Sequence, residues 1–200
     1  MASGTVTEPM TYSAVIVAGG AARRLGGVSK PLIDINGTNL IQYALNAARR
    51  ATQTVVVGPI TVHHPASLTT SEEPPGGGPV AGLAAGLARV DPAPSWVLVL
   101  ACDTPRAERA VHGLEAAARD CPAGTDGVWM TDPRGREQPL LALYRAAALH
   151  SAIASLDTVV GTSMRALTSA LAMAAVPDPM NLSHDADTWE DVETLRKEML

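Results

Sequence analysis

Disulfide bonds, a basic excess and long apolar runs are all missing from this sequence. It has two cysteines, Cys102 and Cys121, and no C-x-x-C pair, which favours the reducing cytoplasm. Lysine and arginine number 15 against 20 aspartates and glutamates, and a net charge of −5 argues against nucleic acid as a partner. No apolar stretch approaches the ~20 residues of a membrane span, and residues 1–10 lack the features of a signal peptide. We therefore expect a cytoplasmic protein that binds neither nucleic acid nor membranes, with residues 1–10 as a disordered tail.

What the chain does contain is an alternation of strand and helix patterns over residues 11–200. Two hundred residues, 46% of them hydrophobic, suffice for one core, so we predict a single domain. Strands are predicted at 12–18, 55–57, 96–101, 128–130, 140–144 and 172–176, and helices at 40–50, 80–87, 107–118 and 189–199. Near-continuous apolar strands between helices predict an α/β fold, a three-layer sandwich with a mostly parallel sheet. Ligands of such sheets bind beyond the carboxyl ends of the strands.

The first such end leads into a loop with two Gly-Gly pairs. Gly19-Gly20 and Gly26-Gly27 flank two arginines, and Lys30 follows. Glycines let backbone N–H groups approach a ligand closely, and arginine and lysine suit phosphate oxygens. The spacing fits neither the P-loop nor the dinucleotide fingerprint. We interpret the loop as a socket for a polyphosphate; the alternative is a glycine-rich turn with surface arginines.

Carboxylates follow in two further segments. Asp103 comes directly after the apolar run 96–101, where it could hold Mg²⁺ against a triphosphate or simply cap the next helix. Asp185 and Asp187 are spaced i, i+2 in an expected extended segment, so they point the same way and can meet one cation, unless Asp187 only begins a helix. Between these segments and the first loop, the Pro- and Gly-rich residues 72–82 end where a helix starts.

Taken together, these motifs resemble the molybdenum cofactor guanylyltransferases, the molybdopterin-guanine dinucleotide biosynthesis protein A family. Residues 19–30 resemble its G-G-x-x-x-R-M-G-G-x-D-K, with Leu25 in place of methionine and Ser29 in place of aspartate. Residues 102–105 resemble C-D-x-P, 78–82 resemble G-P-L-A-G, 138–144 resemble an acceptor-side segment, and 185–192 resemble the closing N-x-N-T-P-E-D-L. The resemblance implies a Rossmann-like nucleotidyltransferase architecture.

The resemblance also implies roles for individual residues. Arg24, Lys30 and Asp103 would be catalytic, and Asp103 with Asp185 would bind Mg²⁺. Nucleotide binding would fall to Ala18, Gly19, Gly20, Arg24, Lys30, Glu73, Gly78, Pro79, Ala81 and Gly82. Glu73 is the better candidate for the acid that contacts the ribose, with Glu72 as the alternative. Gln138 and Arg165 would contact the acceptor.

The function implied is transfer of GMP from GTP to the terminal phosphate of molybdenum-bound molybdopterin, with release of pyrophosphate. GTP and molybdopterin would be the substrates, and Mg²⁺ the cofactor. Proteins that deliver the molybdenum cofactor, or apoenzymes that receive it, would be transient partners. Three alternatives stay open: a cytidylyltransferase or sugar-phosphate nucleotidyltransferase of the same fold, a non-catalytic GTP-binding sensor, and a redox dinucleotide-binding protein. Binding of GTP, CTP and NADH would separate them.

Overall fold

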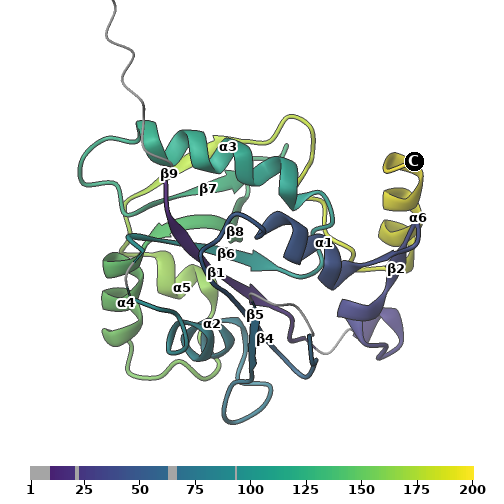
Figure 1. Ribbon diagram of the computed structural model, residues 1–200, viewed down its shortest axis with the longest axis horizontal. Coiled ribbons are helices and arrows are strands. Elements are labelled where there is room, and N and C mark those ends of the chain that lie inside the picture. Colours follow the sequence, from purple (N-terminus) through teal and green to yellow (C-terminus); the bar gives the residue numbers. More distant parts are fainter. Residues whose placement is uncertain (1–9, 21–22, 63–66, 93) are drawn as a thin grey trace, which may run out of the picture.

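A seven-stranded sheet forms the centre of the protein (Figure 1). The computed structural model describes residues 10–20, 23–62, 67–92 and 94–200. The strands are β1 Tyr12–Val17, β2 Asp34–Ile35, β3 Thr38–Asn39, β4 Thr54–Val57, β5 Ser67–Thr70, β6 Trp96–Ala101, β7 Gly127–Thr131, β8 Glu137–Arg145 and β9 Met173–Pro177. The helices are α1 Leu40–Ala47, α2 Pro79–Leu87, α3 Ala107–Asp120, α4 Ala146–Ala154, α5 Met164–Thr168 and α6 Trp189–Glu198, with 3-10 turns η1 Arg23–Leu25 and η2 Lys30–Leu32.

The sheet has the strand order β5-β4-β1-β6-β8-β7-β9, and β2 and β3 form a separate ladder. Strand β8 runs antiparallel to β6 and β7, whereas the other neighbours in the sheet are parallel. The predicted mostly parallel α/β fold is therefore confirmed. Val17 pairs with Val57 on one side and Ala101 on the other, so the carboxyl ends of β1, β4 and β6 lie at one edge.

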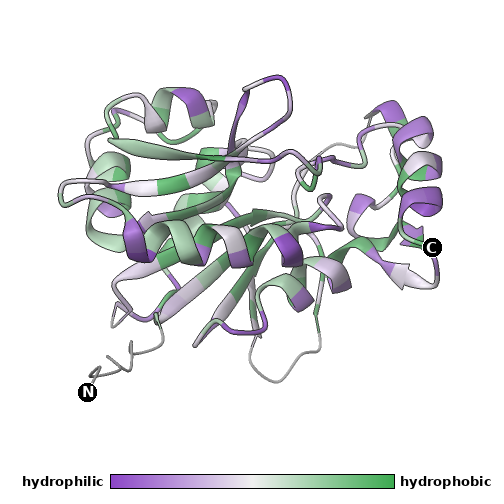
Figure 2. Ribbon diagram, turned by 90° about the horizontal axis from the view of Figure 1, so that it is seen from above, coloured by the Kyte–Doolittle hydropathy of each residue, from purple (hydrophilic) through white to green (hydrophobic). Residues whose placement is uncertain are grey.

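Helices cover both faces of the sheet, which explains why the central strands are apolar at nearly every position. Ile16 and Leu100 face the layer of α1 and α3, while Val15 and Val99 face the layer of α2, α4 and α5. Successive residues of a strand point to opposite faces, so each strand contributes to both cores. In Figure 2 the strands are largely green between helices whose outer turns are purple.

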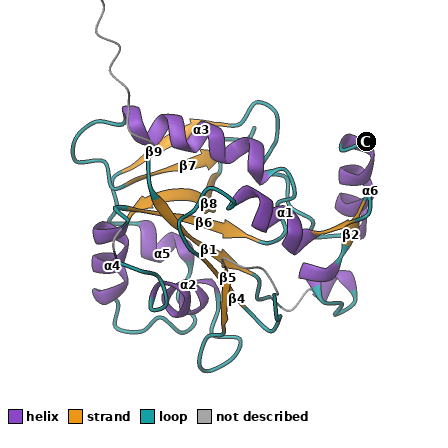
Figure 3. Ribbon diagram, in the orientation of Figure 1, coloured by secondary structure: helices purple, strands orange, loops and turns teal. Residues whose placement is uncertain are grey.

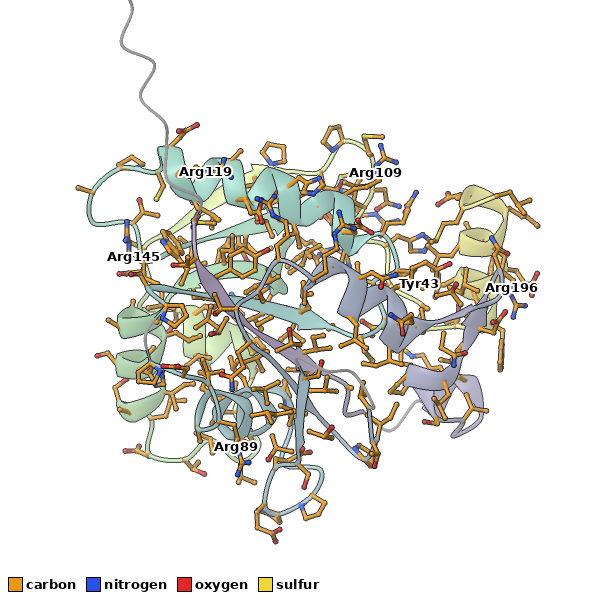
Figure 4. All side chains as sticks on the ribbon, in the orientation of Figure 1. Tyr43, Arg89, Arg109, Arg119, Arg145 and Arg196 are labelled. Carbon is orange, nitrogen blue, oxygen red and sulfur yellow. The ribbon has the colours of Figure 1, made fainter. Side chains whose placement is uncertain are left out.

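A smaller apolar cluster lies beside the sheet, under α6 and the β2-β3 ladder. This lateral cluster consists of Leu25, Ile33, Ile35, Leu40, Ala186, Val192 and Leu195. Tyr43 packs against it, donates a hydrogen bond to the Ile35 carbonyl (3.0 Å) and points from α1 toward α6 (Figure 4). Arg196 of α6 donates to the Asp34 carbonyl (2.8 Å), so the last helix is tied to the ladder.

The structure departs from the expected elements in a few places. The helix expected over 40–50 ends at Ala47, and β5, α4 and the β2-β3 ladder were not expected from the sequence. Residues 1–9 of the expected tail lie outside the described residues, and Met10 packs against the core. Among the residues that the structure describes, no helix is long and apolar enough to cross a bilayer.

Candidate functional site

Loops follow β1, β4 and β6 at the carboxyl edge of the sheet (Figure 3), and residues of these loops line a cavity. Its volume is about 1060 Å³. Its lining includes Gly19, Gly20, Gly58, Thr61, Thr70, Glu72, Gly76, Gly78, Pro79, Gly82, Cys102 and Asp103. The cavity is therefore walled by the expected glycine-rich loop, by the residues around the start of α2, and by Asp103.

Two expected nucleotide residues lie behind this wall. Ala18 is buried and donates its N–H to the Val57 carbonyl (2.7 Å), and Ala81 is buried on α2. Neither belongs to the cavity lining, whereas Gly19, Gly20, Gly78, Pro79 and Gly82 do. The two alanines support the loops that form the wall.

The segment after β4 also lines the cavity, and the sequence patterns did not assign it. Gly58 has φ +149°, and a Cβ there would lie 2.8 Å from the carbonyl carbon of Ala18. A glycine is thus required where the ends of β4 and β1 approach each other. A glycine directly after a short β-branched strand was the available signal.

For the acid of the loop before α2, the structure favours Glu72 over Glu73. Glu72 is half-buried, lines the cavity and accepts a hydrogen bond from the Gly76 N–H (3.0 Å). Glu73 is exposed and lies outside the lining. Glu72 also faces the wall formed by Gly19, so Glu72 is the better placed of the two candidates, and contact of either acid with a ribose stays a prediction.

Lys30 lies between carboxylates from two distant parts of the chain. Its Nζ is 2.6 Å from Asp103 Oδ2 and 2.5 Å from Asp187 Oδ1, and the side chain is 13% exposed. Burial alone would lower the pKa of Lys30, but the charges and hydrogen bonds of Asp103 and Asp187 outweigh burial and raise it. Arg24 is mostly exposed and approaches Asp187 at 3.7 Å.

Asp103, Asp185 and Asp187 bring their carboxylates together within 4.8 Å of one another. Enclosure by the surrounding protein, and then the negative charges of Asp103 and Asp187, raise the pKa of Asp185. Three carboxylates fit the preference of magnesium for oxygen ligands. Asp187 was not among the assigned metal ligands, although its i, i+2 spacing from Asp185 was the signal for it.

The buried carboxylate of Asp178 shapes the segment that carries Asp185. Its two oxygens accept the N–H groups of Leu182 (2.8 Å) and Ser183 (2.7 Å). The Ala186 N–H donates to the Asp103 carbonyl (2.9 Å), which fixes the segment against the end of β6. The position of Asp185 beside Asp103 is thus set by backbone hydrogen bonds on both of its sides.

The C-terminal end of the segment is fixed by the start of α6. The Thr188 side chain accepts the Asp191 N–H, and the Asp191 carboxylate accepts the Thr188 N–H (2.8 Å), which forms a capping box. Thr188 is thus the N-cap of α6, the helix expected over 189–199. Burial would raise the pKa of Asp191, but hydrogen bonds from Thr188 and His184 outweigh it and lower that pKa.

A second cavity, of about 570 Å³, lies on the other side of Asp185. Its lining includes Asp132, Arg134, Arg136, Gln138, Asn181, His184, Asp185 and Asp187. Gln138, expected on the acceptor side, therefore lies next to the carboxylates, and a smaller cavity of about 260 Å³ touches both Gln138 and Asp103.

Arg165, the other expected acceptor residue, is not brought to these cavities. It lies on α5, whose Met164 and Leu167 are buried against the sheet. That orientation leaves Arg165 exposed on the solvent side, and none of the three linings contains it. Contact between Arg165 and an acceptor stays a prediction.

The two departures from the resembled motif have different surroundings. Leu25 is buried in the lateral cluster, where a methionine would have a similar volume. Ser29 is exposed and its side chain does not cap η2. The neighbouring Lys30 is instead held by Asp103 and Asp187, which come from other elements.

Residues 14–175 match the model of the MobA-like NTP transferase domain. The chain belongs to this family. It is a nucleotidyltransferase. A curated relative from Pseudomonas aeruginosa (strain LESB58), named molybdenum cofactor guanylyltransferase, is 35% identical over 137 residues, which are 66% of this chain and 67% of the relative.

Solved structures of nucleotidyltransferases share the fold. Molybdopterin-guanine dinucleotide biosynthesis protein A from Archaeoglobus fulgidus superposes with a TM-score of 0.68 at 21% identity, over 94% of this chain and 98% of that one. 2-C-methyl-D-erythritol 4-phosphate cytidylyltransferase from Thermus thermophilus superposes with a TM-score of 0.67 at 19% identity, with the same coverage. At these identities the likeness shows the Rossmann-like fold alone.

Proposed function

We propose that this protein transfers GMP from GTP to the terminal phosphate of molybdenum-bound molybdopterin, forming the guanine dinucleotide cofactor and pyrophosphate. The observation that carries the proposal is the meeting of Lys30, Asp103 and Asp185 between two cavities. A transfer between two substrates needs adjoining pockets with charged groups at their junction. The name of the Pseudomonas relative supports the choice of substrates.

In this proposal the larger cavity takes the nucleotide. Gly19 and Gly20 would lie against the phosphates, and Gly78 and Pro79 at the start of α2 would lie against the guanosine. Glu72 would accept hydrogen bonds from the ribose hydroxyls, since it is the acid that lines the cavity. The volume of about 1060 Å³ is at the upper end of ordinary ligand pockets, which suits a nucleoside triphosphate.

Asp103, Asp185 and Asp187 would hold Mg²⁺, which when bound neutralises charge on the phosphate oxygens and polarises the α-phosphorus. Lys30 would hold the triphosphate and offset the charge that develops on the departing pyrophosphate. Arg24 is exposed at the edge of the same cluster and would join Lys30 on the phosphates. The acceptor's terminal phosphate would attack the α-phosphorus in line with the leaving group, so positioning and charge neutralisation dominate.

The acceptor would enter from the second cavity. Gln138 and Arg134 line it, and they offer hydrogen-bond donors and a positive charge to a phosphorylated pterin. Asp132 accepts the N–H groups of Arg134 and Arg136 (both 2.9 Å), which fixes the turn that presents these side chains. The hydrogen bond from the Arg136 backbone is the main cause of a lowered pKa at Asp132.

Calorimetric titration with GTP, CTP and ATP, with and without Mg²⁺, tests the nucleotide. Magnesium-dependent binding of GTP, followed by pyrophosphate release when molybdopterin is added, is the expected result. Tighter binding of CTP would overturn the choice of base. Binding of GTP without pyrophosphate release would instead identify a non-catalytic sensor.

Two substitutions test the roles of the charged residues. Lys30→Ala and Asp103→Ala should each lower the turnover about a hundredfold, since losing one such electrostatic contact costs about 3 kcal/mol of transition-state stabilisation. Lys197→Ala is the matched control, because Lys197 is exposed on α6 away from these carboxylates. Circular dichroism should show a folded protein in all three variants. Wild-type turnover in a folded Lys30 or Asp103 variant would contradict the assignment.

A further inference from the structure

The Lys30 ammonium takes up two of the three carboxylates that would hold a metal ion. It lies 2.6 Å from Asp103 and 2.5 Å from Asp187, and both contacts are short charge-assisted hydrogen bonds. We propose that Lys30 is a tethered, displaceable cation: it occupies the divalent-cation position in the ligand-free protein and leaves it for the phosphates when a triphosphate binds. This inference rests on the proposed function, and it adds a coupling between the two binding events.

The geometry makes Lys30 and a divalent ion competitors. The three carboxylates lie within 4.8 Å of one another, so an ion bound among them takes the oxygens to which the Lys30 ammonium donates. Mg²⁺ needs its oxygen ligands at roughly 2.0–2.1 Å in a nearly octahedral arrangement. An ammonium left in place would remove lone pairs from that arrangement and would repel the ion.

The charges favour Lys30 when no ligand is bound. Asp103, Asp185 and Asp187 place three negative charges around one point, and Lys30 is the cation that contacts two of them. Arg24 stays 3.7 Å from Asp187 and is mostly exposed, so it provides only weak compensation.

The local structure leaves Lys30 free to move its head group. Lys30 begins η2, a single 3-10 turn, and the preceding Ser29 makes no side-chain cap. Gly26 and Gly27 just before it have φ angles of +78° and +77°, in a part of the chain that is otherwise exposed. The lysine side chain has a flexible four-carbon stem. The ammonium can therefore reach phosphates in the adjoining cavity without a change in the sheet.

Displacement of Lys30 would couple the two ligands. A triphosphate carries more negative charge than two carboxylates, so it can attract the Lys30 ammonium away from them. The carboxylates that Lys30 releases then become available to the metal ion. Each ligand should then strengthen binding of the other, because coupling between two sites is reciprocal. The metal ion alone should bind weakly to the wild-type protein.

Mn²⁺, titrated without any nucleotide and followed by the EPR signal of the free ion, tests the proposal. Lys30→Met keeps a long unbranched side chain and removes the charge. This variant should bind Mn²⁺ more tightly than wild type, by about 5-fold or more, the lower end of typical coupling effects. Lys197→Met is the matched control, since Lys197 is the other lysine of the chain. It should bind Mn²⁺ as wild type does.

Three results would overturn the displacement. They are unchanged or weaker Mn²⁺ binding by folded Lys30→Met, an equal gain in Lys197→Met, and no measurable Mn²⁺ binding by any form. If Lys30→Met does not fold, Lys30→Gln replaces it, because the amide is also neutral and the same gain in Mn²⁺ binding is expected. No nucleotide is present in this titration. Failure of guanylyl transfer would therefore leave its result intact, and failure of displacement would leave guanylyl transfer standing.

Discussion

Single residues decide how closely α2 approaches the sheet. Gly86 lies on α2 where an added Cβ would be 2.5 Å from Val15 Cγ1 and 2.8 Å from Val57 Cγ2. Both valines are fully buried, so neither can move away at low cost. The absent side chain at this position lets α2 pack closely against β1 and β4, and residues at the start of the same helix line the larger cavity.

Gly86→Ala should lower the free energy of unfolding by about 1–2 kcal/mol, because overpacking outweighs the gain in helix propensity. Gly113→Ala on α3 is the control. An added Cβ there meets only Val176 Cγ1, at 3.9 Å, so the same change should stabilise the protein by about 0.5–1 kcal/mol. Urea unfolding followed by tryptophan fluorescence measures both. A stabilised Gly86→Ala would show that α2 is less tightly packed than the structure indicates.

The residues at strand ends and at the start of α2 were the most predictable part of the candidate site. Asp103, Gly19 and Gly78 were all assigned from the sequence, and all line the larger cavity. Asp187 and Glu72 could not be separated from their acidic neighbours. Neighbours one or two positions apart differ in their contacts only once the loop is folded, and the hydrogen bonds of those loops are not visible in the sequence.

At the scale of elements, the hydrophobic pattern predicted the strands and helices that are buried in the core and missed those that are largely exposed. The strand expected over 96–101 is β6, residue for residue, because all but its last residue are buried. Strand β5 is half exposed at the sheet edge and has a polar sequence, Ser67–Thr70, so no pattern marked it. Helix α4 buries only Leu149 among its nine residues, which leaves no clear helical period.

Because of the capping box of α6, the free energy of unfolding should decrease at acidic pH. The pKa of Asp191 lies below its ordinary value of 3.8 in the folded protein. The ionised carboxylate therefore stabilises the fold above the unfolded pKa, and this contribution is lost as the pH falls through the folded pKa. Asp191→Asn should lower the melting temperature by roughly 2–4 °C at pH 5, as expected for one cap of about 1 kcal/mol.

That difference should shrink as the pH falls from 5 to 3, because wild type loses the same contribution. Thermal melts at intervals of half a pH unit provide the measurement. Glu190→Gln, at an exposed neighbour in the same turn, is the control and should run nearly parallel to wild type. A constant gap between wild type and Asp191→Asn down to pH 3 would contradict the lowered pKa.

At the scale of the whole molecule, the candidate site lies between the main sheet and the lateral cluster, which have hydrophobic cores of different size. Asp103 lies in the turn directly after β6 of the main sheet, whereas Lys30 and Asp187 flank the lateral cluster, which has seven buried members. The two large clusters on the faces of the sheet are far larger. Local opening follows the number of buried apolar contacts, so the lateral cluster should open before the sheet.

Hydrogen exchange measures this difference. Amides of β1 and β6 should exchange most slowly, and those of β2, β3 and α6 at least tenfold faster, which corresponds to about 1.4 kcal/mol or more. GTP with Mg²⁺ should slow exchange in 23–33 and 178–188, because these segments supply the charged groups on the lateral side. Amides of the lateral cluster as slow as those of β1, or no change on adding ligand, would contradict this view.

The charged junction is gathered from the beginning, the middle and the end of the chain, and this has a consequence for synthesis. Lys30, Asp103 and Asp187 leave the ribosome in that order, and a chain grows by about 5–20 residues per second. The strands β1, β4 and β6 can pair while Asp187 has yet to be added. A nascent chain would thus hold Lys30 and Asp103 together before Asp187, the second carboxylate that contacts Lys30, has been added. Proteolytic loss of the segment after β9 would recreate that state, leaving Lys30 with Asp103 but without Asp187.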